Sequence, residues 1–213
     1  PAMLSEYGEV TWSELDAEVD RMANLLRDVG VVHGDVVGFM ISKRPEVVTG
    51  FLACARIGAI MAPINFKLHP DHVRDQVVTA GIRTVFVETA HDDLLSSLLP
   101  ELPDPRRIIY VGGPGRYGNS NTTQEVVGKV GDSVEITPET PCYLNYTSGT
   151  TGRPKGAITT HRNILENAVS TIDGLGFRET DIFLGMFSVF AHPHELFHRS
   201  ILVGGPFVIL DTM

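Results

Sequence analysis

The chain has 213 residues, of which 43% are hydrophobic and 20% charged, and its formal net charge at pH 7 is -9. This is the composition of an ordinary soluble globular protein with enough residues for a substantial core. An acidic chain without a Lys/Arg-rich run is a poor candidate for nucleic-acid binding, because neutralising phosphates requires clustered basic residues, and its acidity also argues against a polybasic membrane tether.

The N-terminus has no basic segment followed by a long apolar run, so we expect no secretory signal. The longest apolar stretch, residues 51–64, is interrupted by Arg56 and is too short to span a bilayer. Cys54 and Cys142 lie far apart and lack metal-ligand spacing, which predicts reduced core thiols in a cytoplasmic protein. The chain begins at Pro1 rather than at Met, and we expect it to be trimmed or excised from a longer one.

Helices and strands are expected to alternate along the first half of the chain. Thr11 and Glu14 have the spacing of a capping box, which predicts a helix that begins there and ends at Gly30. Pro45 and Pro70 are suited to the first turns of two further helices, over residues 45–55 and 70–80. Short apolar runs predict strands over residues 36–41, 60–64, 84–87 and 108–111. This alternation favours an α/β fold in which helices cover a parallel or mixed sheet.

Residues 112–123 are rich in Gly, Asn, Ser and Thr and predict an exposed loop. We take this loop as the boundary between a first α/β subdomain, residues 1–115, and the start of a second, residues 116–213. In the second part the pattern predicts a helix capped by Thr160. The expected elements there are strands over residues 141–146, 157–160, 182–190 and 207–210 and the helix over residues 161–175.

The segment between two of these strands, residues 146–156, combines hydroxyls, glycines and one lysine without any acidic residue. Glycines let backbone N–H groups approach a ligand, and consecutive N–H groups in a turn form an anion-binding nest. With the positive charge of Lys155, the set suits a polyphosphate. The spacing is not that of a Walker A loop, because Pro154 precedes the lysine and Gly156 follows it. A flexible linker is the alternative, and the apolar runs that closely flank the segment count against it.

This segment, with Ala157-Ile158 and His161-Arg162-Asn163 after it, resembles the phosphate-loop signature of the adenylate-forming enzymes. That family includes acyl-CoA synthetases, luciferases and the adenylation domains of peptide synthetases. The resemblance covers nearly the whole chain and is loosest from about residue 92 to 131. Upstream, it rests on residues 11–15, 23–26, 34–37 and 55–65. It implies that the chain is the N-terminal, incomplete part of the large α/β domain of such an enzyme.

The resemblance implies a two-step reaction. A small carboxylic acid attacks the α-phosphate of ATP, giving an acyl-adenylate and pyrophosphate, and the thiol of coenzyme A then displaces AMP. It also implies Mg2+, and fatty acids are our first expectation for the acid. Thr151 and Lys155 would contribute most to catalysis. The residues expected to hold the β- and γ-phosphates are Thr147, Ser148, Gly149, Thr150, Thr151, Gly152 and Lys155.

Many relatives have a phenylalanine followed by a histidine near the α-phosphate and the acyl carboxylate. Phe190 matches the phenylalanine, but Ala191 follows it, and His192 comes one residue later. We expect His192 to take the histidine's role. A catalytically silent protein with the same fold is an alternative that Ala191 motivates, and an adenylation domain of the peptide-synthetase type is another.

The segment from His194-Glu195 to His198 matches H-E-x-x-H, a pattern that binds zinc when it lies on a helix. A zinc hydrolase is therefore a remote alternative. Pro193 before the pattern and Gly204-Gly205-Pro206 after it leave room for only a short helix, and no third ligand follows. We expect no metal site in this chain, and we expect both histidines to cover the start of a helix at the surface.

The resemblance also implies that several functional residues come later than Met213. These are a glutamate that helps to hold Mg2+, an aspartate that binds the ribose, and a lysine of the small C-terminal domain. We therefore expect the chain alone to be inactive and to expose apolar surface that the missing C-terminal part covers, with self-association as a consequence.

Overall fold

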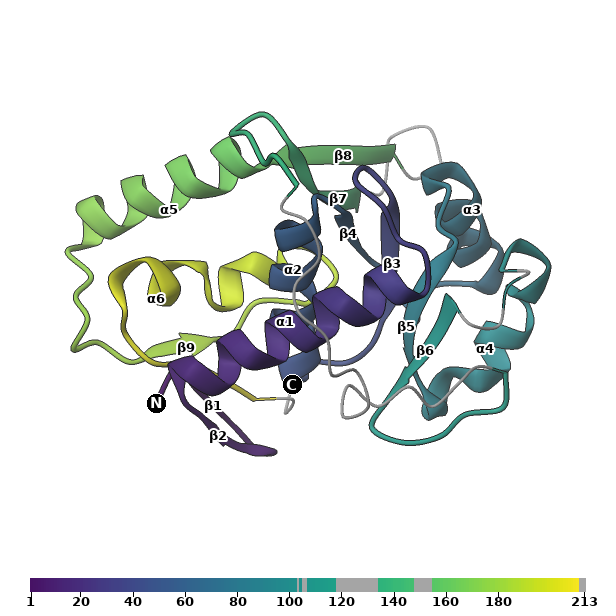
Figure 1. Cartoon of the computed structure of the whole chain (residues 1–213), viewed down its shortest axis with the longest axis horizontal. Helices are drawn as coiled ribbons and strands as arrows, with labels where there is room; N and C mark the ends of the chain where they lie inside the picture. Colours follow the sequence, from purple (N-terminus) through teal and green to yellow (C-terminus); the bar gives the residue numbers. More distant parts are fainter. Residues whose placement is uncertain (103, 105–106, 118–133, 148–154, 211–213) are drawn as a thin grey trace.

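The computed structural model describes residues 1–102, 104, 107–117, 134–147 and 155–210. In this part of the chain the strands form two sheets (Figure 1). The larger sheet has six strands in the order β6-β5-β3-β4-β7-β8, and the smaller has four in the order β2-β1-β10-β9. The strands of the larger sheet are β3 (Val36–Met40), β4 (Ile60–Pro63), β5 (Thr84–Glu88), β6 (Ile108–Val111), β7 (Pro141–Thr147) and β8 (Lys155–Thr160). Those of the smaller sheet are β1 (Met3–Ser5), β2 (Gly8–Val10), β9 (Phe183–Gly185) and β10 (Phe207–Ile209).

The larger sheet is mixed. Strands β6, β5, β3, β4 and β7 are parallel to their neighbours, and β8 returns antiparallel to β7 at one edge. The carboxyl ends of the parallel strands therefore meet at one edge of the sheet, which is where α/β folds of this kind place their ligands. The α/β fold expected from the sequence is confirmed.

The helices begin at the residues that cap them. Thr11 and Glu14 form the expected capping box of α1 (Trp12–Asp28), and Thr160 caps α5 (His161–Leu175). Proline opens α2 and α3 as expected, because its missing N–H costs nothing in a first turn. The remaining helical elements are α2 (Pro45–Ile57), α3 (Pro70–Ala80), α4 (Asp92–Ser96), α6 (His198–Val203), and the 3-10 turns η1 (Thr89–His91), η2 (Leu99–Glu101) and η4 (Pro193–Leu196).

Both faces of the larger sheet are buried. Alternate residues of each strand point to opposite faces, so Phe39 packs in one apolar cluster and its neighbour Met40 in the other. The first cluster contains the inner faces of α1 and α2, and the second those of α3 and α4. Cys54 and Cys142 are both buried and unpaired, as the sequence predicted.

The sequence predicted one strand over residues 182–190, but β9 ends at Gly185. Its partner in the sheet, β10, has only three residues in the same register, so nothing extends the pairing. The chain then turns, and the carbonyl of Ser188 accepts hydrogen bonds from the amides of Ala191 and His192, at 3.4 and 3.3 Å. The hairpin β1–β2 and the helix α4 had no expected counterpart, because their short segments carry too little periodicity.

Each sheet contains strands from both sides of residue 115. Most of the loop expected at the boundary, residues 118–133, lies outside the described residues. The division into residues 1–115 and 116–213 stays a prediction. Along the described residues, none of the helices combines the length and the apolar character of a membrane span.

Candidate functional site

The hairpin β7–β8 brings the two ends of the expected phosphate loop together. Thr147, the last residue of β7, lies opposite Lys155, the first residue of β8. The Thr147 hydroxyl donates to the Lys155 carbonyl at 3.5 Å, and both residues are exposed. Five of the expected phosphate-binding residues lie outside the described residues, namely Ser148, Gly149, Thr150, Thr151 and Gly152. Of the candidate set, the structure therefore brings Thr147 and Lys155 together.

The segment that carries Phe190 and His192 is attached to the same strand. Tyr143 of β7 is fully buried, and its hydroxyl donates a hydrogen bond to the carbonyl of Ala191. The His192 side chain is exposed, directly beyond this attachment, and its ring centroid lies 5.8 Å from that of His194. Phe190 is half-buried and meets Phe66 edge to face at 4.9 Å.

A cavity of about 310 Å³ lies at the carboxyl edge of the sheet, between the loops that follow β3 and β4 and the segment after β9. Phe66 forms part of its wall and stacks on His91 with 3.8 Å between the ring centroids. Lys43 donates to the carbonyl of Gly185 at 3.4 Å, which ties the loop after β3 to the end of β9. The lining residues are Ser42, Lys43, Phe66, Lys67, Met186, Phe187, Ser188, Val189 and Phe190.

Glu88 at the end of β5 holds this edge in shape. Its carboxylate accepts hydrogen bonds from the amide and the hydroxyl of Ser42, at 2.6 and 3.1 Å, and lies 3.6 Å from the Arg44 guanidinium. It also lies 3.8 Å from the imidazole of His91. Burial lowers the pKa of His91, and the charge of Glu88 opposes that shift only in part. The cavity beside it is lined by phenylalanine and lysine side chains, a set that suits an apolar ligand carrying negative charge.

The two histidines of the H-E-x-x-H pattern are buried rather than at the surface, which corrects the expectation from sequence. They do not share one helix, because η4 ends at Leu196 and α6 begins at His198. His198 Nδ1 donates to the His194 carbonyl at 2.6 Å. Glu195 accepts from Arg199 at 2.5 Å and lies 3.8 Å from His194 Nε2.

This buried cluster does not form a metal centre in the part of the chain that the structure describes. There, no group of three or more His, Cys, Asp and Glu side chains is arranged to hold a metal ion. His198 Nδ1 already bonds a carbonyl, and the Glu195 carboxylate is paired with a guanidinium. The described geometry thus gives the zinc hydrolase alternative no ligand set.

Burial, followed by the nearby charge of His198, lowers the pKa of His194 to about 4 from the ordinary 6.5. The unfolded chain therefore takes up the proton first as the pH falls. The contribution to stability is complete above about pH 6.5 and is lost as the pH falls towards 4. We expect the free energy of unfolding to fall by about 2 kcal/mol between pH 7 and pH 5 through this group.

Denaturant titrations at the two pH values measure this fall. In the variant His194→Gln it should be smaller by at least about 1 kcal/mol, because glutamine does not titrate. His72→Gln is the control, since this histidine is exposed on α3. An equal fall in wild type and His194→Gln would contradict the assignment of the pH dependence to His194.

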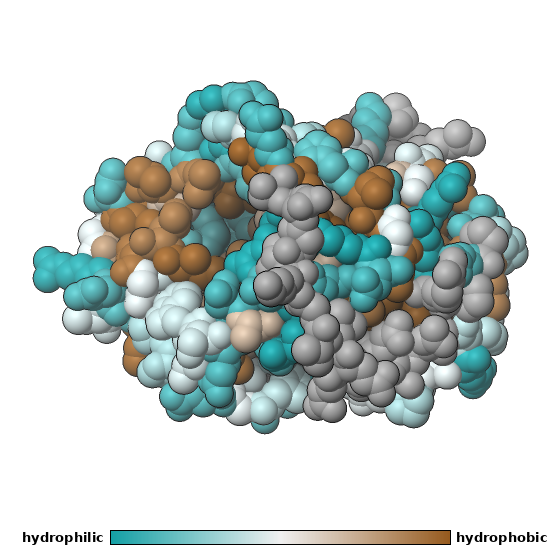
Figure 2. Space-filling view, in the orientation of Figure 1, coloured by the Kyte–Doolittle hydropathy of each residue, from teal (hydrophilic) through white to brown (hydrophobic). Residues whose placement is uncertain are grey.

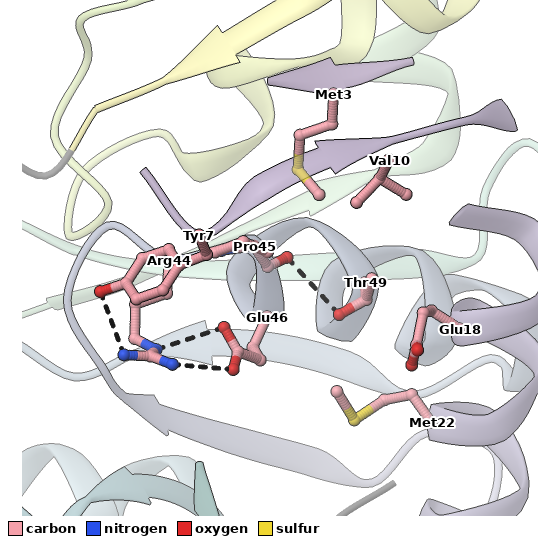
Figure 3. A pocket seen from close by; sticks show the side chains of 9 residues that line it. All are labelled: Met3, Tyr7, Val10, Glu18, Met22, Arg44, Pro45, Glu46 and Thr49. Atoms are coloured by element: carbon pink, nitrogen blue, oxygen red, sulfur yellow. Dashed lines mark hydrogen bonds and ion pairs between the residues drawn. The ribbon is translucent and has the colours of Figure 1, made fainter. Parts of the chain in front are cut away.

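A second cavity, of about 470 Å³, lies between the β1–β2 hairpin, α1 and α2 (Figure 3). Its main charged group is already engaged: Arg44 bonds both carboxylate oxygens of Glu46 and the hydroxyl of Tyr7, and lies 4.4 Å from the Tyr7 ring centroid. Met3, Val10 and Met22 supply apolar surface. Because the Arg44 guanidinium already bonds Glu46 and Tyr7, we assign this cavity a structural role.

Apolar side chains are exposed over α5 and α6 (Figure 2). In α5, Ile164 and Ala168 are buried, but Leu165 and Val169, on the next stripe of the helix, are about half exposed. Leu175 and Leu202 are exposed as well. A stripe of this kind is unusual on the surface of a complete domain and is typical of a surface that another segment covers.

Sequence reasoning missed Tyr143, Phe66 and Glu88. In the sequence, Tyr143 is one apolar residue of a predicted strand. The role of its hydroxyl is visible only in the structure, where it donates to the carbonyl of Ala191. Phe66 and Glu88 each follow or end a strand of the parallel sheet. Their position was a usable signal, because the parallel strands β4 and β5 lie on either side of β3 and have their carboxyl ends at the same edge of the sheet.

Known proteins resemble this chain over most of its length. A family model described as AMP-binding enzyme matches residues 1–212. The chain is 33% identical, over 78% of its length, to a 3-hydroxybenzoate–CoA ligase of Aromatoleum sp. (strain CIB), and spans 32% of that protein. It is 31% identical, over 82% of its length, to an acetyl-coenzyme A synthetase of Bdellovibrio bacteriovorus, and spans 30% of that protein. The chain thus spans about a third of the length of these curated relatives.

Solved structures match the fold. The whole chain superposes on an anthranilate CoA ligase in complex with anthranoyl-AMP, with a TM-score of 0.89 and 26% identity, covering 42% of that chain. It also superposes on a structure from Rhodopseudomonas palustris CGA009, described as a long-chain-fatty-acid CoA ligase, with a TM-score of 0.90 and 24% identity, covering 53% of that chain. The second match concerns the fold alone.

Proposed function

This chain belongs to the AMP-binding enzyme family, and on that basis we propose that the protein to which it belongs activates a carboxylic acid with ATP and transfers the acyl group to coenzyme A. In the first step a carboxylate oxygen attacks the α-phosphorus, an acyl-adenylate forms, and pyrophosphate leaves. In the second step the thiol of coenzyme A attacks the acyl carbonyl and AMP leaves. The observation that carries the proposal is the β7–β8 hairpin, which presents Thr147 and Lys155 side by side at the two ends of residues 148–154, a segment whose sequence is rich in Gly, Ser and Thr.

Lys155 and the loop would bind the β- and γ-phosphates. Such transfers are accelerated mainly by positioning and by donors aimed at developing negative charge. Lys155 is exposed at the start of β8 and supplies a full positive charge, and the segment has no acidic residue to oppose it. Thr147 adds a hydroxyl on the facing strand. The roles of Ser148, Gly149, Thr150, Thr151 and Gly152 stay predictions from the family resemblance. We also propose Mg2+ as a companion of ATP, and we assign it no ligand among the described residues.

The cavity at the carboxyl edge is our candidate for part of the coenzyme A site. Coenzyme A carries phosphates, and this cavity is lined by Lys43 and Lys67. A hydrogen bond between a lysine ammonium and a phosphate contributes about 1.5–3 kcal/mol. Because the first step does not need coenzyme A, a defect in this cavity should separate the two half-reactions.

We expect Lys67→Ala in the whole protein to raise the KM for coenzyme A about tenfold, from the loss of about 1.5 kcal/mol of charge-assisted hydrogen bonding to a phosphate. The acid-dependent exchange of pyrophosphate into ATP should stay within about twofold of wild type. Steady-state thioester formation and the exchange assay measure the two quantities. Arg21→Ala is the control, because Arg21 is a cation of α1 that lies outside the cavity lining. Equal damage to both half-reactions in Lys67→Ala would overturn the assignment.

We propose an aromatic carboxylic acid as the substrate, in place of the fatty acid expected from the sequence. The support is the resemblance to a 3-hydroxybenzoate–CoA ligase and to an anthranilate CoA ligase.

His192 is our candidate for the histidine that relatives carry near the α-phosphate. It is exposed one residue beyond Ala191, whose carbonyl is bound by Tyr143. An exposed imidazole at this place could donate to a phosphate or carboxylate oxygen without moving the backbone. The assignment rests on position in the fold and on the family resemblance.

The rest of the protein is the partner that we propose for the exposed apolar stripe of α5. Leu165 and Val169 form a second apolar face that α6 and β8 leave uncovered within the described residues. Covering it with another segment of the same chain removes apolar area from water. Self-association of the isolated chain through this stripe is the expected consequence of its exposure.

A direct test is product analysis with the whole protein, ATP, Mg2+, coenzyme A and a panel of acids from acetate to palmitate with benzoate and its hydroxylated forms. The proposal predicts AMP and an acyl-CoA of matching mass, with aromatic acids ahead of palmitate. A preference for palmitate would contradict the substrate class but keep the reaction. Release of acid or peptide products that depends on bound zinc would favour the hydrolase instead.

A further inference from the structure

We propose that Tyr143 is a positioning residue for the acid-binding step, because its hydroxyl fixes the carbonyl of Ala191 and thereby holds the Phe190–His192 segment against strand β7. The inference rests on the proposed function and goes beyond it, since it links two parts of the site that neither sequence pattern connects. The contact joins residues 48 positions apart in the chain.

The hydrogen bond between Tyr143 and Ala191 is held in place by the packing around the Tyr143 ring. Tyr143 is 1% exposed, and its ring is flanked by Phe51 at 6.4 Å and, edge to face, by His194 at 5.4 Å, both measured between ring centroids. A buried phenol without a hydrogen-bond partner would cost about 1–3 kcal/mol, so the hydroxyl is strongly directed to the Ala191 carbonyl. Burial also raises the pKa of Tyr143, which keeps the hydroxyl protonated and able to donate.

The residue type at position 191 explains why the Tyr143 hydroxyl bonds a backbone carbonyl. Alanine has no polar side chain, so the carbonyl is the strong acceptor that this residue offers. The amides on either side are engaged locally: Phe190 donates to the Ser188 hydroxyl at 3.2 Å, and His192 donates to the Ser188 carbonyl at 3.3 Å. The Tyr143 hydroxyl thus connects this turn to the strand leading to the phosphate loop.

The same strand supplies a matched control. Tyr146 lies three residues further along β7, and its hydroxyl contacts the opposite side of the sheet, where it bonds Thr79 at 2.8 Å and the Gln76 carbonyl of α3 at 3.1 Å. Tyr143→Phe and Tyr146→Phe therefore each remove one phenolic hydroxyl from the same strand. Only the first removes a tie to the segment that carries His192.

The experiment compares the two variants in the whole protein by acid-dependent exchange of pyrophosphate into ATP. In Tyr143→Phe we expect the KM for the acid to rise about tenfold, with the KM for ATP within twofold of wild type. Tyr146→Phe should leave the KM for the acid within twofold of wild type. A merely structural loss would lower the amount of active protein, and hence kcat, without separating the two KM values.

Hydrogen exchange keeps the inference testable if activity is lost or absent. Tyr143→Phe should speed the exchange of amides in residues 188–195 and leave α3 unchanged, and Tyr146→Phe should do the reverse. Unchanged exchange in residues 188–195, or an unchanged KM for the acid in an active Tyr143→Phe variant, would overturn the inference. An inactive wild type with every acid would overturn the proposed function instead, and the hydrogen-exchange comparison would still decide the role of Tyr143.

Discussion

Replacing Lys155 with alanine in the whole protein is expected to slow acyl-adenylate formation about a hundred-fold. Removing one preorganised donor from a site of developing negative charge costs on the order of 3 kcal/mol. Lys155 stands at the first position of β8, opposite Thr147, so its backbone is fixed by the hairpin while its side chain is exposed. The variant should thus lose a charge at the phosphates without losing a packing contact.

Exchange of pyrophosphate into ATP measures this step, and thermal unfolding checks that the fold is intact. Lys155→Arg should retain part of the rate, because it keeps the charge but changes the geometry of the donor. Arg21→Ala on α1 is the control for loss of a surface cation, since Arg21 forms an ion pair with Glu18 of the same helix. Unchanged exchange in Lys155→Ala would remove the lysine from the catalytic assignment.

The second large effect is expected at Gly50, on the face of α2 that meets the larger sheet. A Cβ at this position would lie 2.2 Å from Cε1 of Phe39. Phe39 cannot move aside easily, because it is 1% exposed and stacks on Phe86 at 4.7 Å between ring centroids. We therefore expect Gly50→Val to lower the free energy of unfolding by about 3 kcal/mol through overpacking.

Gly174→Val in α5 is the matched control. A Cβ at Gly174 meets nothing within 4 Å, so the same substitution should change the free energy of unfolding by no more than about 0.5 kcal/mol. Denaturant titration of both variants measures the difference. Similar stabilities for Gly50→Val and Gly174→Val would show that α2 does not approach the sheet as closely as described.

Local signals in the sequence were sufficient for most of the regular elements. Thr11 and Glu14 predicted the start of α1, and Thr160 that of α5, because a cap is decided by a few neighbouring residues. The three-residue strands β1 and β2 were missed. β2 pairs with β1, and β1 pairs with β10, about 200 residues later, which is a tertiary contact that no local pattern contains.

The residues of the candidate site also fall into those that the sequence could predict and those that it could not. Lys155 and Thr147 could be named from their loop, because the chemistry of a phosphate site is concentrated in one short segment. Tyr143 could not, since its role depends on a carbonyl 48 residues away. The surface position expected for His194 and His198 was wrong for a related reason: their burial comes from packing against α2, β7 and α5, where Phe51, Tyr143 and Asn167 meet them.

The most direct measurement is carboxylate-dependent exchange of labelled pyrophosphate into ATP by the whole protein, with acids from acetate to palmitate and benzoate. The account predicts exchange that requires an acid and is fastest with an aromatic one. Absence of exchange with every acid, in folded protein that still binds ATP, would contradict adenylate formation and favour a catalytically silent member of the family.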